Sequence, residues 1–168
     1  MPRIDFKLIW DFCHDRAPVP LVLREAGATS TSELCAILLR EASEQRDAGG
    51  LEATLIVCSR FEQIDANKGL LGALAHEDWH HSQEDIISSL DDLRDPGLIP
   101  TFVRATQWLP THMAWDDENR GLALRAIRAI AKIGGPKADD ALRELAQSEH
   151  PGRRALAERK LRERAERA

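Results

Sequence analysis

A repeat of about 40 residues, carried by helical spacing of apolar side chains, constrains the fold of this chain more than any other feature. Residues 87–102 align with residues 127–142 at an offset of 40 positions, and Pro96 aligns with Pro136. Proline at the same place in each copy indicates the first turn of a helix, where a missing N–H costs no helical hydrogen bond. A period in this range is typical of helix-pair repeats. The aligned apolar positions are Leu90 with Ile130, Leu93 with Ile133, and Phe102 with Leu142.

A third, partial copy and an insertion complete the pattern of residues 67–168. Residues 74–79 correspond to residues 145–151 with one residue of slack, and residues 107–118 lengthen the middle unit. Because no unit can bury its apolar stripe alone, we expect neighbouring helix pairs to stack into a short right-handed α-α solenoid. The last helix, Pro151–Ala168, becomes almost wholly charged towards its end, as the solvated cap of an open solenoid would.

Residues 1–66 predict an N-terminal helical segment that packs on the solenoid. The lack of tyrosine and the scarcity of period-two alternation argue against strands. Ser30 and Glu33 form an S-x-x-E capping box at the start of a helix, and we expect this helix to stop at Gly49-Gly50. The other predicted stretches are Phe6–Cys13 after an Asp5 cap, a short turn of helix over Leu21–Glu25 ended by Gly27, and a helix from about Leu51 to Ile64.

The composition is typical of a folded cytoplasmic protein. No apolar run reaches the roughly 20 residues that cross a bilayer, and the first residues lack the pattern of a secretory signal. Cys13, Cys35 and Cys58 are widely spaced among apolar neighbours, which indicates buried thiols in a reducing compartment. We therefore expect an all-α protein with an N-terminal segment, residues 1–66, and a repeat region, residues 67–168.

Two stretches of the repeat region resemble a known family. The segments Leu-x-Asp-Leu-Arg-Asp-Pro-x-Leu-Ile-Pro and Ala-Ile-Arg-Ala-Ile-Ala-Lys-Ile-Gly-Gly-Pro resemble the short HEAT-like repeats that are also found in phycobilin lyases. With its Asn-Lys-Gly-Leu-Leu-Gly-Ala-Leu and Glu-Asp-Trp-His-His segments, the chain also resembles small bacterial HEAT-repeat proteins suspected to be immunity factors of polymorphic toxin systems. The first resemblance implies the fold, and the second implies a protein partner, the cognate toxin.

The charge of the chain indicates where such a partner would bind. The formal net charge of −5 is divided into −8 for residues 1–115 and +3 for residues 116–168, and acids are densest over residues 63–95. Such a surface attracts basic partners, and tryptophans beside it are typical interface anchors. Trp108 is a further anchor or a core residue. The predicted partner-binding residues are Glu77, Asp78, Trp79, Glu84, Asp85, Asp91, Asp92, Trp115, Asp116, Asp117 and Glu118.

The stretch His76-Glu77-Asp78-Trp79-His80 matches the H-E-x-x-H sequence of zinc peptidases. A zinc site of this kind needs both histidines on one continuous helix, with the glutamate activating water. The repeat alignment instead places Asp78 and Trp79 in a turn between two helices, where we expect Asp78 to cap the next helix and Trp79 to pack against it. We therefore predict no metal site here, and a zinc hydrolase using His76 and His80 is the alternative.

Other functional classes find little support in the sequence. Arg120, Arg125, Arg128 and Lys132 form a basic stripe on one predicted helix, but the preceding repeat carries acids there, so a nucleic-acid groove is not expected. The sequence has no glycine-rich phosphate loop, no G-x-S-x-G and no C-x-x-C. We predict a non-catalytic protein-binding module without a cofactor, most specifically an immunity protein against a basic toxin domain such as a nuclease. A scaffold or assembly protein of the HEAT class is the other alternative.

Overall fold

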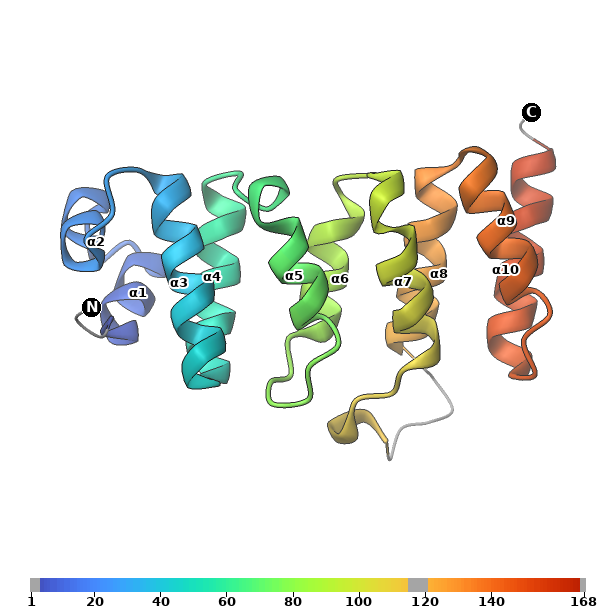
Figure 1. Ribbon diagram of the computed structural model, residues 1–168, viewed down its shortest axis with the longest axis horizontal. Coiled ribbons are helices and arrows are strands. Elements are labelled where there is room, and N and C mark those ends of the chain that lie inside the picture. The colour runs from blue at the N-terminus through green and yellow to red at the C-terminus, as the bar shows by residue number, and fades with distance from the viewer. Residues whose placement is uncertain (1–3, 115–120, 167–168) are drawn as a thin grey trace.

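The computed structural model describes residues 4–114 and 121–166 of the chain. Within these ranges the chain is all-helical, with no strand, which confirms the all-α part of the predicted fold class. Figure 1 shows the helices side by side in an elongated row, with α3, α5, α7 and α9 in front of α4, α6, α8 and α10, and the termini at opposite ends. The α-helices are α1 (Phe6–Cys13), α2 (Val19–Ala26), α3 (Thr31–Gln45), α4 (Ala48–Arg60), α5 (Lys68–Leu74), α6 (Gln83–Asp91), α7 (Ile99–Gln107), α8 (Gly121–Ile133), α9 (Gly135–Leu145) and α10 (Pro151–Ala165).

The first helices begin and end where local chemistry predicts. The Asp5 carboxylate accepts a hydrogen bond from the backbone N–H of Lys7 and so caps α1. Gly27 ends α2 with a left-handed φ of 66°. Ser30 caps α3 by accepting from the Glu33 N–H, and the Glu33 carboxylate reaches back to the N–H of Thr29. The predicted capping box is therefore present, with its return bond shifted one residue outward.

The predicted stop at Gly49-Gly50 is wrong. Helix α3 already ends at Gln45, and Arg46 is left-handed with a φ of 49°. The Asp47 carboxylate then accepts from the Gly50 N–H at 3.0 Å and starts α4, so that both glycines lie in the first turn of this helix. An aspartate cap satisfies an N–H that helix formation leaves without a partner, and here it outweighs the weak helix propensity of two glycines.

The repeat observed in the sequence corresponds to equivalent helices. Helices α6 and α8 occupy the same place in successive units, as do α7 and α9. Pro96 begins a 3-10 turn, Pro96–Leu98, that leads into α7, and Pro136 lies in the first turn of α9. Leu90 and its aligned partner Ile130 are fully buried, and so are Phe102 and its aligned partner Leu142. These aligned positions therefore lie at equivalent, buried places in the two helix pairs.

One continuous hydrophobic core joins the two predicted parts of the chain. It runs from Ile9 in α1 to Ala157 in α10 and includes buried residues of every α-helix. Cys35 and Cys58 lie in it as buried thiols, and their mutual hydrogen bond, together with burial, raises the pKa of the Cys58 thiol. Among the described residues, every helix is too short or too polar to cross a bilayer.

Candidate functional site

Two connections from neighbouring repeats meet at one end of the helix row. We call residues 75–82, between α5 and α6, and residues 108–114, after α7, the loop surface; Figure 1 shows both below the helices. The Thr111 N–H donates to the Asp78 carboxylate at 2.8 Å, and the Thr111 hydroxyl donates to its other oxygen. The rings of His81 and His112 are stacked with their centroids 4.2 Å apart. These contacts between residues more than 30 positions apart hold the two connections together.

His76 and His80 do not share a helix. Helix α5 ends at Leu74 and α6 begins at Gln83, so both histidines lie in the connection, as the repeat alignment predicted. His80 is fully buried, and its Nε2 lies 3.0 Å from the Leu74 carbonyl while its Nδ1 accepts from the Ser82 N–H at 3.1 Å. Both ring nitrogens of His80 are therefore engaged by backbone. The described residues contain no group of three metal-binding side chains, and the geometry lends the zinc alternative no support.

The predicted cap at Asp78 is wrong, because its carboxylate binds Thr111 instead. Helix α6 begins five residues later, after Ser82, whose side chain makes no capping bond. The connection is ordered differently: the Gln83 amide donates to the backbone carbonyls of Glu77 and His80, both at 2.7 Å. Gln83 is itself fully buried, so a side chain from the helix fixes the turn that precedes it.

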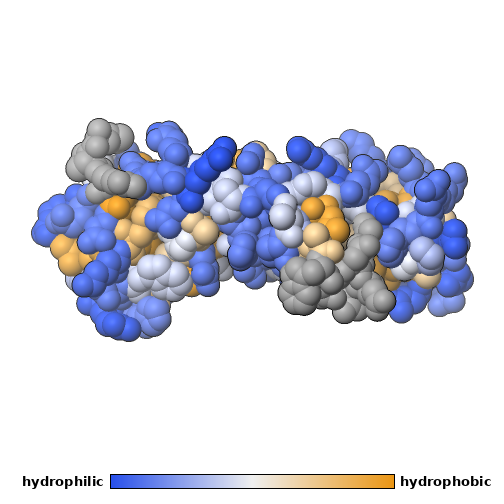
Figure 2. Space-filling view, turned by 90° about the horizontal axis from the view of Figure 1, so that it is seen from below, coloured by the Kyte–Doolittle hydropathy of each residue, from blue (hydrophilic) through white to orange (hydrophobic). Residues whose placement is uncertain are grey.

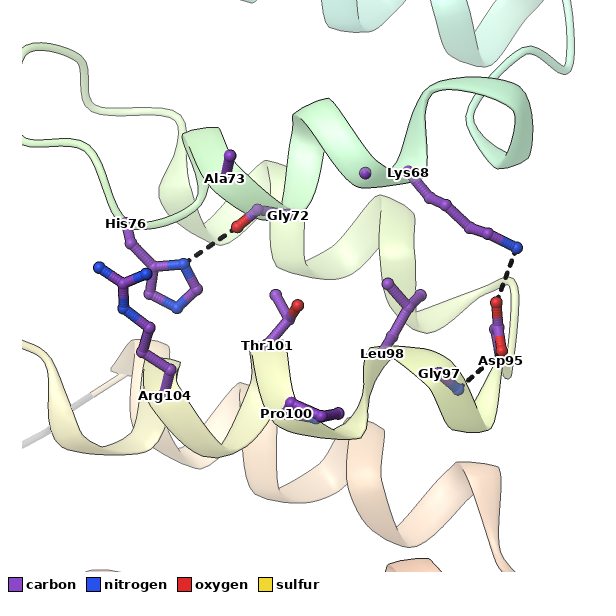
Figure 3. A pocket seen from close by; sticks show the side chains of 11 residues that line it. Lys68, Gly72, Ala73, His76, Asp95, Gly97, Leu98, Pro100, Thr101 and Arg104 are labelled. Carbon is purple, nitrogen blue, oxygen red and sulfur yellow. Dashed lines mark hydrogen bonds and ion pairs between the residues drawn. The ribbon is translucent and has the colours of Figure 1, made fainter.

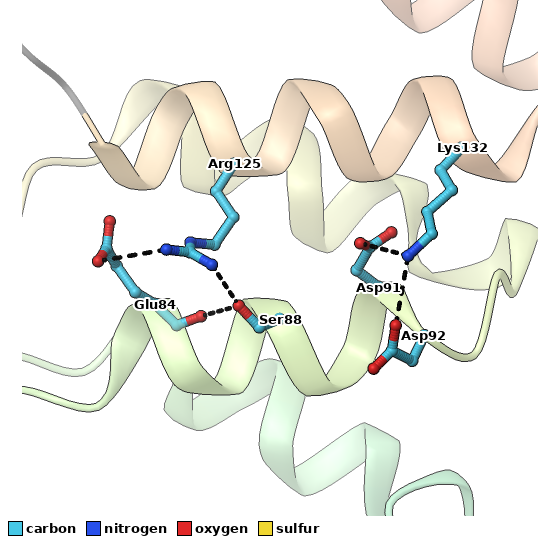
Figure 4. Close-up of polar contacts among 6 residues, drawn as sticks. All are labelled: Glu84, Ser88, Asp91, Asp92, Arg125 and Lys132. Carbon is cyan, nitrogen blue, oxygen red and sulfur yellow. Dashed lines mark hydrogen bonds and ion pairs between the residues drawn. The ribbon is translucent and has the colours of Figure 1, made fainter.

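The acids of α6 are largely paired with cations of α8 (Figure 4). Lys132 lies 2.9 Å from a carboxylate oxygen of Asp91 and 3.3 Å from one of Asp92. Arg125 lies 3.7 Å from a Glu84 carboxylate oxygen and donates to the Ser88 hydroxyl at 2.7 Å. The predicted acidic surface is therefore partly neutralised within the molecule. The sequence contained a signal for this pairing that was missed. Asp92 and Lys132 are 40 residues apart, which is the repeat offset, and stacking of helix pairs brings equivalent positions together.

The remaining predicted residues fall into three groups. Glu77, Asp78 and Asp85 are exposed. Trp79 is half-buried, with its ring edge-on to His80 at 4.6 Å, and Trp108 is half-buried with its ring 6.0 Å from that of His76, so both tryptophans pack against the core. The others, Trp115, Asp116, Asp117 and Glu118, lie outside the described residues.

Burial favours the neutral form of three histidines in this region. It lowers the pKa of His80, and likewise the pKa values of His76 and His112, because the charged ring would lose its hydration. The two hydrogen bonds from Thr111 lower the pKa of the exposed Asp78 carboxyl. The loop surface therefore presents Asp78 as an anion near the neutral rings of His80 and His112 at neutral pH. Figure 2, which views the molecule from this side, shows a mostly hydrophilic face with small apolar areas.

Sequence reasoning missed a groove between α5 and α7, shown in Figure 3. It has a volume of about 490 Å³ and is lined on the α5 side by Gly69, Gly72 and Ala73. The glycine spacing was the available signal, because two glycines one turn apart leave a helix face without side chains. His76 and Arg104 stand at one end of the groove.

No protein-family model, curated protein or solved structure matches this chain.

Proposed function

We propose that this protein is a non-catalytic protein-binding module built as a HEAT-like solenoid. Successive helix pairs, prolines at the starts of equivalent helices, and a core shared between neighbouring pairs support this assignment. Helix-pair solenoids use extended faces and the loops at their edges to bind other macromolecules. In its most specific form, we propose an immunity protein that neutralises a basic bacterial toxin domain. A partner of this kind is what the sequence resemblance implies.

The observation that carries this proposal is the cross-linked loop surface. Asp78 and Thr111 belong to different repeats, and their hydrogen bonds hold the two connections in one arrangement before any partner arrives. A surface ordered in advance loses less conformational entropy on binding than mobile loops do. Glu77 and Asp78 are exposed there beside the half-buried Trp79, which combines anionic groups with an aromatic side chain suited to a basic partner.

The ion pairs of α6 favour an interface centred away from that helix. Because Asp91 and Glu84 are engaged by Lys132 and Arg125, they contribute less field to an approaching cation than their number suggests. Glu77 and Asp85 have no cation paired with them among the described residues. We therefore centre the interface on the loop surface, with Asp85 beside it.

Calorimetry with a cognate toxin domain, sought among the genes that neighbour this one, tests the proposal. We expect equimolar binding that abolishes the domain's activity, and a roughly ten-fold loss of affinity for Glu77→Lys at low salt that shrinks in 0.5 M salt. Glu149→Lys is the matched control, because it makes the same charge change at an exposed residue between α9 and α10. A domain that keeps its activity with excess protein present overturns the proposal.

A further inference from the structure

Helices α3 and α4 form a hairpin that places two cysteines at the same level. Cys35 lies 11 residues before Arg46, which follows the last residue of α3, and Cys58 lies 11 residues after Asp47, which caps α4. Helices joined by so short a turn run antiparallel, and the two pack against each other (Figure 1). Residues equally far from such a turn lie opposite one another, so the hairpin brings the two thiols within reach.

The two thiols are buried and hydrogen-bonded to each other. The exposed fraction of both cysteines is 0%, and the Cys58 S–H donates to the Cys35 sulfur. This hydrogen bond lowers the pKa of Cys35, and together with burial it raises the pKa of Cys58. Cys35 is therefore the thiol that reaches the reactive thiolate form more readily, while Cys58 is held beside it.

Cys13 is not part of this pair and serves as an internal reference. Its thiol is partly exposed and donates to the Ala53 carbonyl at 3.6 Å. Cys13 is 22 residues from Cys35, and Cys58 is 23 residues from it on the other side. Closing either loop in an unfolded chain costs nearly the same entropy. A link that forms selectively between Cys35 and Cys58 therefore reports their contact in the fold.

We propose that Cys35 and Cys58 form an intramolecular disulfide when the protein meets hydrogen peroxide, and that this bond fastens α3 to α4. The Cys35 thiolate attacks one peroxide oxygen, the O–O bond breaks, hydroxide leaves, and Cys35 becomes a sulfenic acid. The Cys58 sulfur then attacks the Cys35 sulfur, the S–O bond breaks, and water leaves with the Cys58 proton. The two thiols together lose two electrons, and the peroxide is reduced to two molecules of water, the second formed from hydroxide and the original Cys35 proton.

The burial of the pair selects a small oxidant. Hydrogen peroxide is close to water in size and can enter the core when the hairpin opens locally, whereas a bulky disulfide such as glutathione disulfide needs a much larger opening. Burial also shields the bond, once formed, from external thiols. The bond does not depend on the proposed protein-binding function, because no residue of the loop surface takes part in it.

The bond strengthens the N-terminal part of the fold. Helix α1 packs on α4 and α2 packs on α3, so a link between α3 and α4 holds the support of both. A disulfide that closes residues 35–58 into a loop restricts the unfolded chain. We expect the midpoint of thermal unfolding to rise by about 6–12 °C on oxidation. The rise should vanish once the protein has been reduced in urea and refolded.

Treatment of the folded full chain with hydrogen peroxide, followed by tryptic digestion without reductant, tests the link. Trypsin separates the three cysteines into residues 8–16, 25–40 and 47–60. We expect mass spectrometry to find the second and third of these peptides joined by a disulfide and the first outside the link. Cys35 and Cys58 that remain free thiols, become sulfinic acids or link to Cys13 overturn the proposal.

Two variants of equal chemical change test the role of the pair. Cys13→Ala keeps both members and should show the same link and the same rise of the thermal midpoint as wild type. Cys35→Ala removes one member and should show neither after the same treatment, and Cys58→Ala, which removes the other, is the second such variant. A rise as large as that of wild type in either of the last two variants overturns the proposal.

Discussion

The carboxylate of Asp78 accepts two hydrogen bonds from Thr111, one from its backbone N–H and one from its hydroxyl, across 33 residues of sequence. This contact joins the connection between α5 and α6 to the segment that follows α7, so that the two form a single surface. Two loops without this contact would move independently and present their side chains in many relative arrangements. The Asp78–Thr111 hydrogen bonds reduce the number of these arrangements.

Removal of this pair should loosen the loop surface while the helices stay intact. In Asp78→Ala we expect the Thr111 amide to exchange with solvent about ten-fold faster or more, because it loses its acceptor. Hydrogen exchange followed by NMR measures this. Asp85→Ala removes another exposed acid and should leave the Thr111 amide unchanged. Equal exchange rates in wild type and Asp78→Ala would show that the contact does not order the loop.

Protonation of buried histidines should make the fold acid-sensitive. A neutral His80 accepts from the Ser82 N–H, and burial lowers its folded-state pKa below its ordinary 6.5. The unfolded chain then binds more protons, so the free energy of unfolding is highest above pH 6.5 and decreases as the pH falls from there through the folded-state pKa. Urea unfolding between pH 7.5 and 5 should show this decrease, with a smaller slope in His80→Gln. His76 contributes in the same direction, so some slope should remain; an identical slope in His80→Gln would contradict this role for His80.

The ion pairs between α6 and α8 should contribute modestly to stability. In Lys132→Met we expect a loss of about 1 kcal/mol or less, because the pair is partly exposed. The loss arises chiefly because Asp91, whose Oδ1 is buried without a hydrogen-bond partner, keeps its charge without the ammonium group. A double-mutant cycle with Asp91→Asn isolates the coupling, and the coupling should shrink in 1 M salt. Additive single-variant effects would show that the pair contributes nothing.

The two glycines at the start of α4 should respond in opposite ways to alanine. A Cβ at Gly50 would lie 2.9 Å from an Asp47 carboxylate oxygen and 3.0 Å from the Phe6 ring, so Gly50→Ala should destabilise the fold by about 1–3 kcal/mol. A Cβ at Gly49 makes only an ordinary 3.7 Å contact, and Gly49→Ala should stabilise by up to about 1 kcal/mol. Thermal unfolding of the two variants compares them directly. A stabilising Gly50→Ala would show that the cap and Phe6 move aside.

Charge reversal within α6 is a less specific probe of partner binding than the sequence suggests. Reversal of Asp91 or Glu84 breaks a contact with Lys132 or Arg125, so a loss of partner affinity would be accompanied by a change in the packing of α6 on α8. Glu77 has no such contact among the described residues. We expect Glu77→Lys to weaken partner binding with the urea midpoint unchanged, whereas Asp91→Lys should lower both.

Most helix boundaries and the spacing of the repeat follow from local patterns in the sequence. Caps such as Asp5 and Ser30, the left-handed Gly27, and the aligned prolines act on backbone groups within a few residues, so local patterns were enough to find them. The same alignment placed His76 and His80 in a turn. The predicted helix end at Gly49-Gly50 was wrong because two local effects oppose each other there: the low helix propensity of glycine and the Asp47 cap. The strength of this cap depends on a hydrogen bond that residue types alone do not show.

Only the tertiary structure decided which surfaces meet. The pairing of Asp91 with Lys132, the contact of Asp78 with Thr111, and the groove between α5 and α7 all join residues from different segments of the chain. Each depends on how closely neighbouring helix pairs approach, which is set by the packing of a whole core rather than by the spacing of any one stretch. For this reason the acids Glu84, Asp91 and Asp92, which look like an exposed run in the sequence, are partly engaged in ion pairs within the molecule. For the same reason Gly69 and Gly72 line a groove that the sequence did not predict.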